Sequence, residues 1–268
     1  MKLIVTSNTI FKQAALPASD LSSNDKIDVK AGTEYEITAY LEIGAQPYGH
    51  VKFTLKDQFL AGKNTWIAYQ QNVEIRNDDG LKVIGKYQVG DKLPEKVDLP
   101  VVWFRQLDNK YEPHRTCNVT CVAMCLYYFG IRPKNSNERL PDELFQFVES
   151  KGWDRYAHDD LRQLFIEYGV SDEFKMSATW DEVKTHLANN NPVILPGLFT
   201  ASGHIIVLRG YDDTGFLVND PNGEFFYSGY REDLTGENLH YSYQLVQSKS
   251  MNGPDATWAH FPKNSNYS

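Results

Sequence analysis

The stretch RTCNVTCVAMCLYYFGI, residues 115–131, decides the fold of the larger part of this chain. After Arg115 and Thr116 it is almost wholly apolar and carries no further charge, which is typical of a buried helix. Gly130 stands where such a helix needs a residue that accepts the left-handed conformation at its end. The sequence therefore predicts a buried helix that begins at Cys117.

The chain has three cysteines, Cys117, Cys121 and Cys125, all in this helix. An odd number within nine residues argues against a disulfide framework, and a spacing of four differs from the paired pattern of a zinc site. We therefore expect no metal and no cofactor. Backbone N–H groups at the start of a helix favour a thiolate, so Cys117 is the candidate nucleophile. Cys121 and Cys125 are expected to pack as small apolar side chains.

The segments that follow alternate in type in a way that indicates an α+β fold. Helices are predicted first and strands afterwards, an order that favours a segregated antiparallel sheet. Thr179 begins a capping box with Glu182, which marks one helix start. VVWFRQ (101–106) is also strand-like. The predicted helices are 141–152, 159–169 and 180–190, and the predicted strands are 191–199, 203–213, 215–221 and 240–247.

Two further residues complete a candidate catalytic set with Cys117. His204 begins one predicted strand, and Asp220 ends the next one, sixteen residues later. If DDTG (212–215) joins these strands as a hairpin, the start of the first lies beside the end of the second. A histidine oriented by a carboxylate is the base that a cysteine nucleophile needs. Gln106, eleven residues before Cys117, is the candidate donor to the oxyanion, together with the backbone N–H of Cys117.

The N-terminal part has a different character. Short β-rich runs separated by Gly, Asn and Asp turns predict a small all-β barrel or sandwich over residues 1–77. The polar stretch 78–99 is predicted to be a linker, residues 100–250 the catalytic domain and residues 251–268 a C-terminal tail. The N-terminal part resembles bacterial SH3-like domains in its strand spacing, its AGT turn and its closing run TWIAYQQNVEI (65–75). That resemblance implies a module that binds peptides or cell-wall polymers.

A second resemblance covers about residues 100–248. Gln106, the run 115–131 and GHIIVLRGYDDTGFLVNDPNG (203–223) are similar to the motifs of the double-glycine leader peptidase-like family, a papain-like group of cysteine peptidases. The resemblance implies a nucleophile at Cys117, a base at His204, an orienting Asp220 and an oxyanion donor at Gln106.

The sequence departs from that family in two respects. Many members have Gly-Pro-Thr-Ser after the nucleophile, whereas this chain has Asn118-Val119-Thr120-Cys121. We expect Asn118 and Val119 to narrow the cleft and alter substrate choice, and Asn118 and Gly203 to contact the substrate. Members that process bacteriocin leaders are fused to membrane transporters, and the sequence contains no transporter segment, which argues against leader processing.

Composition limits the kinds of partner. The formal net charge is -8, with 12 Lys and Arg against 13 Asp and Glu in residues 1–98, which leaves 15 against 22 beyond them. An acidic catalytic part argues against a nucleic acid or an anionic membrane, because phosphate binding needs clustered basic residues. The start, MKLIVTSNTIFKQ, has too short an apolar run for a signal peptide, so we expect synthesis in the cytoplasm and, for a wall enzyme, release by lysis or through a pore.

Three functions remain open from the sequence. The first is a peptidoglycan peptidase, such as a phage lysin, held on the cell wall by the N-terminal module. The second is an intracellular peptidase or amide hydrolase that acts on proteins or peptides. The third is a binding protein on a papain-like scaffold, since a fold alone does not establish activity. An acyltransferase would use the same acyl-enzyme, and the oligomeric state is open.

Overall fold

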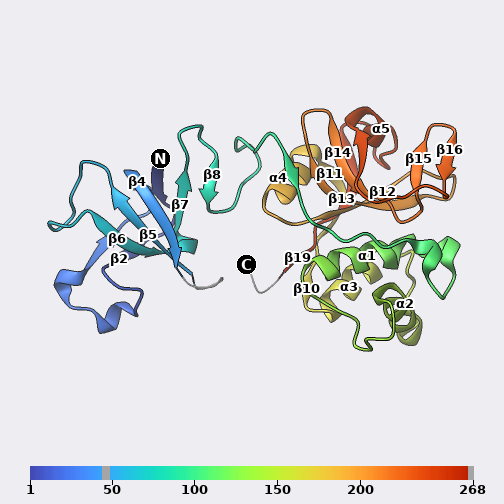
Figure 1. Ribbon diagram of the computed structural model, residues 1–268, viewed down its shortest axis with the longest axis horizontal. Helices are drawn as coiled ribbons and strands as arrows, with labels where there is room; N and C mark the ends of the chain where they lie inside the picture. The colour runs from blue at the N-terminus through green and yellow to red at the C-terminus, as the bar shows by residue number, and fades with distance from the viewer. Residues whose placement is uncertain (44–48, 265–268) are drawn as a thin grey trace. The chain divides into compact units, whose positions relative to one another are not determined.

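A computed structural model of the chain describes residues 1–43 and 49–264, which divide into two compact units (Figure 1). The first unit is Met1–Lys92, and the second begins at Leu93. Each unit has its own cluster of buried hydrophobic side chains.

The first unit is an all-β structure built on one continuous path of eight strands. Its strand order is β3-β2-β6-β5-β4-β1-β7-β8, and every neighbouring pair is antiparallel. Phe11, Phe53 and Trp66 are among the largest side chains fully buried in it. An SH3-like barrel in particular stays a prediction. The strands are β1 (Lys2–Val5), β2 (Thr9–Lys12), β3 (Lys26–Val29), β4 (Glu34–Ile43), β5 (His50–Leu55), β6 (Thr65–Tyr69), β7 (Val73–Arg76) and β8 (Lys82–Ile84).

The segment 78–99 is not the simple linker that its polar composition predicts. Strand β8 extends the first sheet by pairing with β7. The ammonium of Lys82 on β8 is buried and lies 2.8 Å from carboxylates of both Glu74 and Asp91, which satisfies its charge. Strand β9 (Val97–Asp98) belongs instead to the second unit, where it pairs with β13. Polar residues here therefore form buried pairs and edge strands.

The second unit combines helices with an antiparallel sheet, as the order of predicted elements indicates. In Figure 1, α1, α2 and α3 lie together on one side of the second unit, and the strands β12, β13 and β14 lie on the other. The helices are α1 (Cys117–Tyr128), α2 (Leu140–Lys151), α3 (His158–Glu167), α4 (Trp180–Ala188) and α5 (Tyr243–Ser248). The main sheet has the order β11-β18-β12-β13-β14-β17, with β9 beside β13. Its strands are β11 (Phe174–Thr179), β12 (Val193–Gly197), β13 (His204–Tyr211), β14 (Gly215–Asn219), β17 (Leu239–Ser242) and β18 (Ala256–His260).

Local sequence signals explain where these helices begin and end. The capping box predicted at the start of α4 is confirmed: the Thr179 hydroxyl accepts from the Glu182 amide, and the Glu182 side chain accepts from Thr179. Pro141 lies in the first turn of α2, and Gly152 ends that helix at a φ of 66°. Gly130 follows α1 at a φ of 88°, a conformation that glycine adopts without steric cost.

Three segments differ from their predicted form. Residues 101–105 form no strand, and Gln106 begins a short 3-10 helix (Gln106–Asp108). The Val101 carbonyl accepts from the Asn219 side chain and the Trp103 indole donates to the Asp220 carbonyl, so this segment bonds to the chain around the end of β14. The predicted strand 240–247 ends early: the hydroxyl of Ser242 accepts from the Leu245 amide and starts α5. The predicted tail 251–268 contains β18, which lies between β11 and β12 in the sheet. Its last residues, 265–268, lie outside the described part of the chain.

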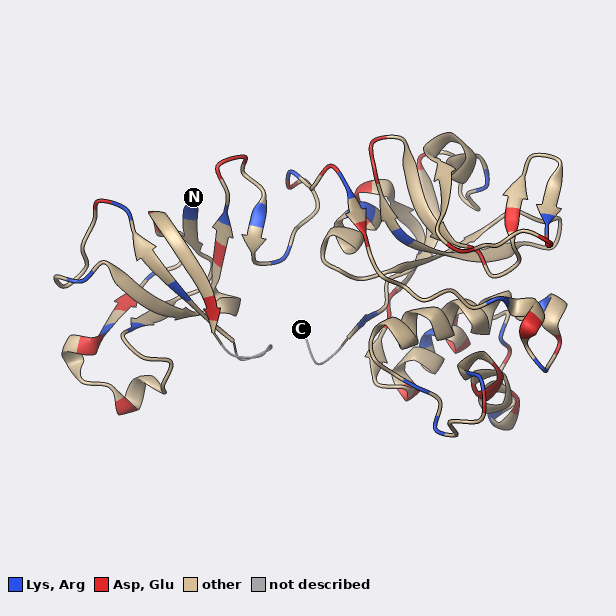
Figure 2. Cartoon of the chain, viewed as in Figure 1, with Lys and Arg blue, Asp and Glu red and all other residues tan. Residues whose placement is uncertain are grey.

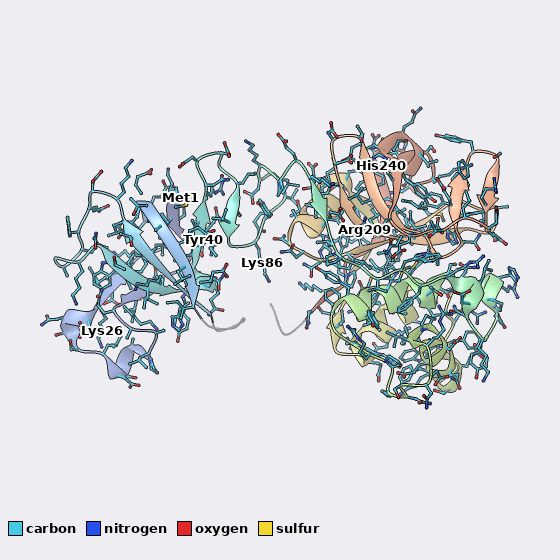
Figure 3. The ribbon with its side chains drawn as sticks, viewed as in Figure 1. Met1, Lys26, Tyr40, Lys86, Arg209 and His240 are labelled. Atoms are coloured by element: carbon cyan, nitrogen blue, oxygen red, sulfur yellow. The ribbon has the colours of Figure 1, made fainter. Side chains whose placement is uncertain are left out.

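The packing of α1 on β13 forms the centre of the second unit. Strands β12 and β14 carry no charged residue, as Figure 2 shows, and every residue of β12, β13 and β14 is buried. Arg209, labelled in Figure 3, is the charged residue of β13; its guanidinium pairs with Asp98 and donates to the Leu99 carbonyl. This bonding fixes the chain leading into the site against the sheet.

The described residues include no helix with both the length and the apolar character needed to cross a membrane.

Candidate active site

Cys117 is the first residue of α1 and is partly exposed. The first turn of an α-helix has N–H groups without intrahelical acceptors, so the thiol lies at the positive end of the helix dipole. Thr116, the N-cap residue, is held by the side-chain amide of Asn109 at 3.0 Å. The hydroxyl of Thr120 in turn donates to the Thr116 carbonyl at 2.7 Å. The position of Cys117 is therefore fixed by a buried polar network.

Asn118 has an internal role in place of the predicted contact with substrate. Its side chain is 4 % exposed, its amide donates to the Arg155 carbonyl at 2.9 Å, and its oxygen accepts from the Val119 amide. The guanidinium of Arg155 pairs with Glu112 on the loop before the helix. Because both polar ends of Asn118 are already bonded, this side chain stabilises the approach to Cys117 and does not narrow the cleft.

His204 and Asp220 are brought together as the predicted hairpin requires. Strand β13 pairs with β14 in a register that places Val207 opposite Asn219, so the start of one strand lies beside the end of the other. The Nε2 of His204 lies 2.9 Å from Oδ1 of Asp220. The His204 side chain is 5 % exposed and that of Asp220 is fully buried, so water does not weaken this pair.

The pKa of the His204 imidazole depends on burial, on Asp220 and on Cys117. Burial alone would lower that pKa, but the charges of Asp220 and Cys117 and their hydrogen bonds outweigh burial and raise it to about 10. His204 is therefore a cation at neutral pH and favours an anionic sulfur beside it.

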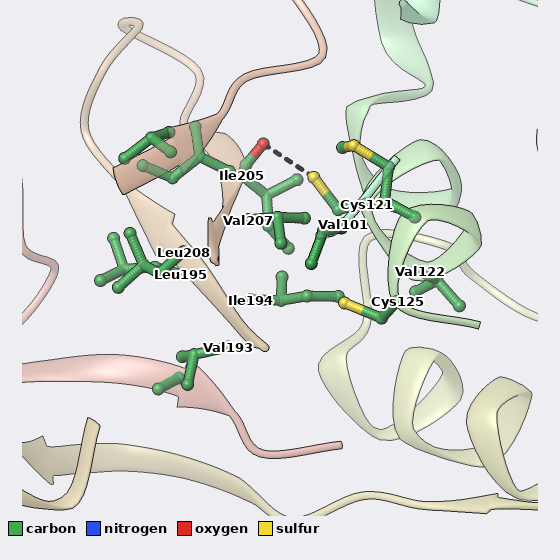
Figure 4. Packing of buried hydrophobic residues seen from close by; sticks show 14 of the residues in the cluster. Val101, Cys121, Val122, Cys125, Val193, Ile194, Leu195, Ile205, Val207 and Leu208 are labelled. Carbon is green, nitrogen blue, oxygen red and sulfur yellow. Dashed lines mark hydrogen bonds between the residues drawn. The ribbon is translucent and has the colours of Figure 1, made fainter. Parts of the chain in front are cut away.

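A hydrogen bond between the two elements that carry these residues supports their alignment. The thiol of Cys121, one turn after Cys117, donates to the carbonyl of Ile205 at 3.2 Å (Figure 4). Cys121 and Cys125 are both fully buried, as expected of packing residues. Burial raises the pKa of each of their thiols well above its ordinary value. Both thiols are therefore protonated and unreactive at neutral pH.

Gln106 is hydrogen-bonded both to the segment next to Asp220 and to the segment before Cys117. Its backbone N–H donates to the Pro221 carbonyl, next to Asp220, and its side-chain amide donates to the Pro113 carbonyl, four residues before Cys117. The side chain is buried, and its Oε1 has no hydrogen-bond partner among the described residues. One of the two amide hydrogens is left over, since Pro113 takes one.

Gly203 precedes His204 in a turn at a φ of 84°. A Cβ atom built on Gly203 would meet no heavy atom within 4 Å, so the space beside it is open. This position is compatible with a peptide backbone approaching the site.

Sequence reasoning missed two residues that contact Asp220. The hydroxyls of Tyr230 and Tyr241 donate to its Oδ2 at 2.9 and 3.1 Å. Tyr230 belongs to the small hairpin of β15 (Glu224–Phe226) and β16 (Gly229–Arg231), which follows the motif region. No spacing in the sequence relates either tyrosine to Asp220, so no signal identified them.

A second histidine cluster lies outside this site. Asp172 bonds to His260, and His260 bonds to His158, at 2.6 and 2.9 Å. These residues join α3 to β18, and among the described residues no group of three or more His, Cys, Asp or Glu is arranged to hold a metal ion. His186 bonds separately to the Pro262 carbonyl.

Comparison with known proteins places this geometry in a family. Residues 98–251, more than half of the chain, match the model of the Peptidase_C39 like family. The chain belongs to the Peptidase_C39 like family. It is a cysteine peptidase, so the alternative of a binding protein without activity is set aside.

Two solved structures are similar to this Peptidase_C39 like chain over 65% of its length. One is a putative C39-like peptidase from Bacillus anthracis, with 18% identity, a TM-score of 0.47 and 100% of that chain covered. The other is a double glycine motif protease from an AMS/PCAT transporter, in complex with the leader peptide, with 14% identity, a TM-score of 0.37 and 93% of that chain covered. No curated protein matches the sequence.

Proposed function

We propose that this peptidase cleaves amide bonds through Cys117, His204 and Asp220, with Gln106 as a donor to the oxyanion. The observation that carries the proposal is the hydrogen bond of His204 to the buried Asp220, together with a thiol at a helix N-terminus that acts on the same imidazole. A nucleophile, its base and an orienting carboxylate are the three parts that acyl transfer requires.

The reaction follows from the protonation states. With the proton on His204, the Cys117 thiolate attacks the scissile carbonyl and forms a tetrahedral intermediate. The Cys117 N–H and the free amide hydrogen of Gln106 stabilise its oxyanion. His204 then donates its proton to the leaving amine as the C–N bond breaks, which leaves a thioester on Cys117 and a neutral imidazole.

Hydrolysis of the thioester returns the enzyme to its starting state. Neutral His204 takes a proton from water, and the resulting hydroxide attacks the thioester carbonyl. The C–S bond breaks, the acid product leaves, and the proton on His204 again faces the Cys117 thiolate. Asp220 orients the ring and stabilises its positive charge throughout the cycle.

For the substrate, we propose the peptide part of peptidoglycan, as in a phage lysin. The support is the combination in one chain of the peptidase unit with a separate all-β unit, residues 1–92, that has its own core. Such a unit is free to bind the polymer while the second unit cuts it. The competing substrate is a protein or peptide inside the cell.

The test uses purified wild-type protein and Cys117→Ala with peptidoglycan of several chemotypes, and in parallel with a mixture of unrelated peptides. Cys125→Ala is the matched control, because this thiol is buried in the core away from the site. We expect mass spectrometry to find new amino or carboxyl ends in the wall with wild type and Cys125→Ala only. Cleavage of the peptides with the walls intact would reject the wall substrate and keep the triad.

A further inference from the structure

The carboxylate of Asp220 is bonded at both oxygens, although only one of them faces His204. Oδ1 accepts from His204 and from the Asn222 amide at 3.0 Å. Oδ2 accepts from Tyr230 at 2.9 Å and Tyr241 at 3.1 Å. A buried carboxylate needs hydrogen-bond donors in order to stay ionised. With four donors placed around it, the Asp220 carboxylate is held in a single orientation.

Tyr230 reaches Asp220 from a different element than the triad. In the β15–β16 hairpin, Tyr230 lies opposite Phe225, and their rings are 5.2 Å apart. The Tyr230 ring also meets that of His204 at 5.2 Å in an edge contact. One side chain therefore contacts the base through its ring and the orienting carboxylate through its hydroxyl.

Tyr241 connects the hairpin to the main sheet. It lies on β17, and its hydroxyl donates to Asp220 while accepting from the Phe225 backbone N–H at 2.8 Å. Burial, followed by the charge of Asp220, raises the pKa of both tyrosines, so their hydroxyls remain donors over the pH range in which a peptidase works. The hairpin and the carboxylate thus share one hydrogen-bond network.

We propose that Tyr230 and Tyr241 are positioning residues for catalysis, which lock the Asp220 carboxylate so that Oδ1 stays on Nε2 of His204. The inference rests on the proposed triad and deepens it. Without the two hydroxyls, Oδ2 has no donor among the contacts described for it, and the carboxylate turns away from His204. The imidazolium then loses its main partner and gives up its proton at a lower pH.

The alternative is that the two hydroxyls only anchor the hairpin to the fold. That role would affect stability but would not move the titration of His204. The charged and titratable groups around His204 are Cys117 on α1, Asp220 after β14 and Tyr230 on β16, while Cys121 and Tyr241 lie behind them. A change in Tyr230 or Tyr241 that moves this titration therefore acts through Asp220 or the ring contact.

The test measures the rate at which iodoacetamide alkylates Cys117 in the full chain as a function of pH. The variants are Tyr230→Phe, Tyr241→Phe and the double variant, which keep the rings and remove the hydroxyls. Tyr168→Phe is the matched control, because Tyr168 donates to the Glu143 carboxylate at 2.8 Å away from the site. Asp220→Asn shows what loss of the carboxylate charge does.

We expect the alkaline transition of His204 to move down by about one pH unit in the double variant, a tenfold change in proton affinity of the size that loss of hydrogen bonds to a charged group produces. Each single variant should move it less, and Tyr168→Phe should leave it in place. Nitrogen NMR titration of His204 gives the same quantity independently. If the double variant fails to fold, Tyr230→Phe alone decides, because within residues 1–43 and 49–264 the Tyr230 hydroxyl bonds to Asp220 alone.

Two negative results are distinguishable. If Asp220→Asn moves the transition and the tyrosine variants match wild type, the positioning role is wrong and the triad stands. If Asp220→Asn also leaves the transition unchanged, the proposed triad itself is wrong.

Discussion

The thiol of Cys121 is hydrogen-bonded to the carbonyl of Ile205, so the helix that begins with Cys117 is joined to the strand that begins with His204. The bond lies one residue beyond His204 and one helical turn beyond Cys117. Cys121 and Ile205, the two residues that it joins, are both buried. The alignment of thiol and imidazole therefore depends on the core directly beneath them.

Replacing Cys121 by alanine should reduce both stability and activity. The variant leaves the Ile205 carbonyl without its donor and opens a small cavity, which together cost about 1–3 kcal/mol. Cys125→Ala, which opens a similar cavity one turn further on, is the control. We expect Cys121→Ala to lose more free energy of unfolding than Cys125→Ala in urea titration, and also to lose more kcat/KM under conditions where both variants are folded. Equal kinetic losses would show that the bond has no part in alignment.

Alkylation of the native protein should be confined to Cys117. Burial raises the pKa of the other two thiols, and His204, whose pKa is about 10, stabilises a thiolate at Cys117 alone. Peptide mass spectrometry after a short treatment with iodoacetamide at pH 6 should find one labelled site. His204→Ala should slow that labelling at least tenfold. Equal labelling of all three cysteines would contradict the arrangement described above.

Gln106→Ala should lower kcat far more than it raises KM. An oxyanion donor acts only as charge develops, and removal of one such donor costs about 100- to 1000-fold in kcat. Gln106→Glu keeps the shape of the side chain but removes its donor hydrogens, so it should be equally inactive. The two variants are compared by steady-state kinetics on a cleavable peptide. A main effect on KM would mean that Gln106 binds substrate and does not stabilise the oxyanion.

The protein should lose stability in mild acid because of two histidines outside the site. Burial holds the pKa of His158 and of His186 at about 4, whereas an unfolded histidine has a pKa near 6.5. The unfolded chain therefore binds more protons between these values, and the free energy of unfolding falls as pH drops from about 6.5 to 4. His204 has the opposite sign, because its raised pKa gives stability that is lost as pH rises toward 10.

Urea titrations at pH 7, 5.5 and 4.5 check the acid loss. His158→Gln should flatten the fall in stability between pH 6.5 and 4, since it removes one of the two protons involved. Tyr168→Phe, at the opposite end of α3, should leave the slope unchanged. A slope in His158→Gln equal to that of wild type would assign the acid loss to other groups.

The sequence by itself determined the secondary structure near the motifs and the pairing of His204 with Asp220. Two apolar runs joined by a short turn indicate a hairpin locally, and caps such as Thr179 with Glu182 fix helix ends through bonds within a few residues. These signals are local in the chain and can be identified without the fold. The boundaries of the two units were harder to predict from the sequence. Strand β8 is only three residues long, and β9 and β18 pair with strands that are remote in sequence.

Only the tertiary structure decided which side chains surround Cys117, His204 and Asp220. Asn118 was expected to lie at the cleft because it follows Cys117, but its side-chain amide donates to the Arg155 carbonyl in the core. Tyr230 and Tyr241 reach Asp220 across a hairpin and a neighbouring strand, a contact that depends on where remote segments pack. Side-chain contacts between distant segments carry no period or spacing in the sequence, because the packing of the whole unit sets them.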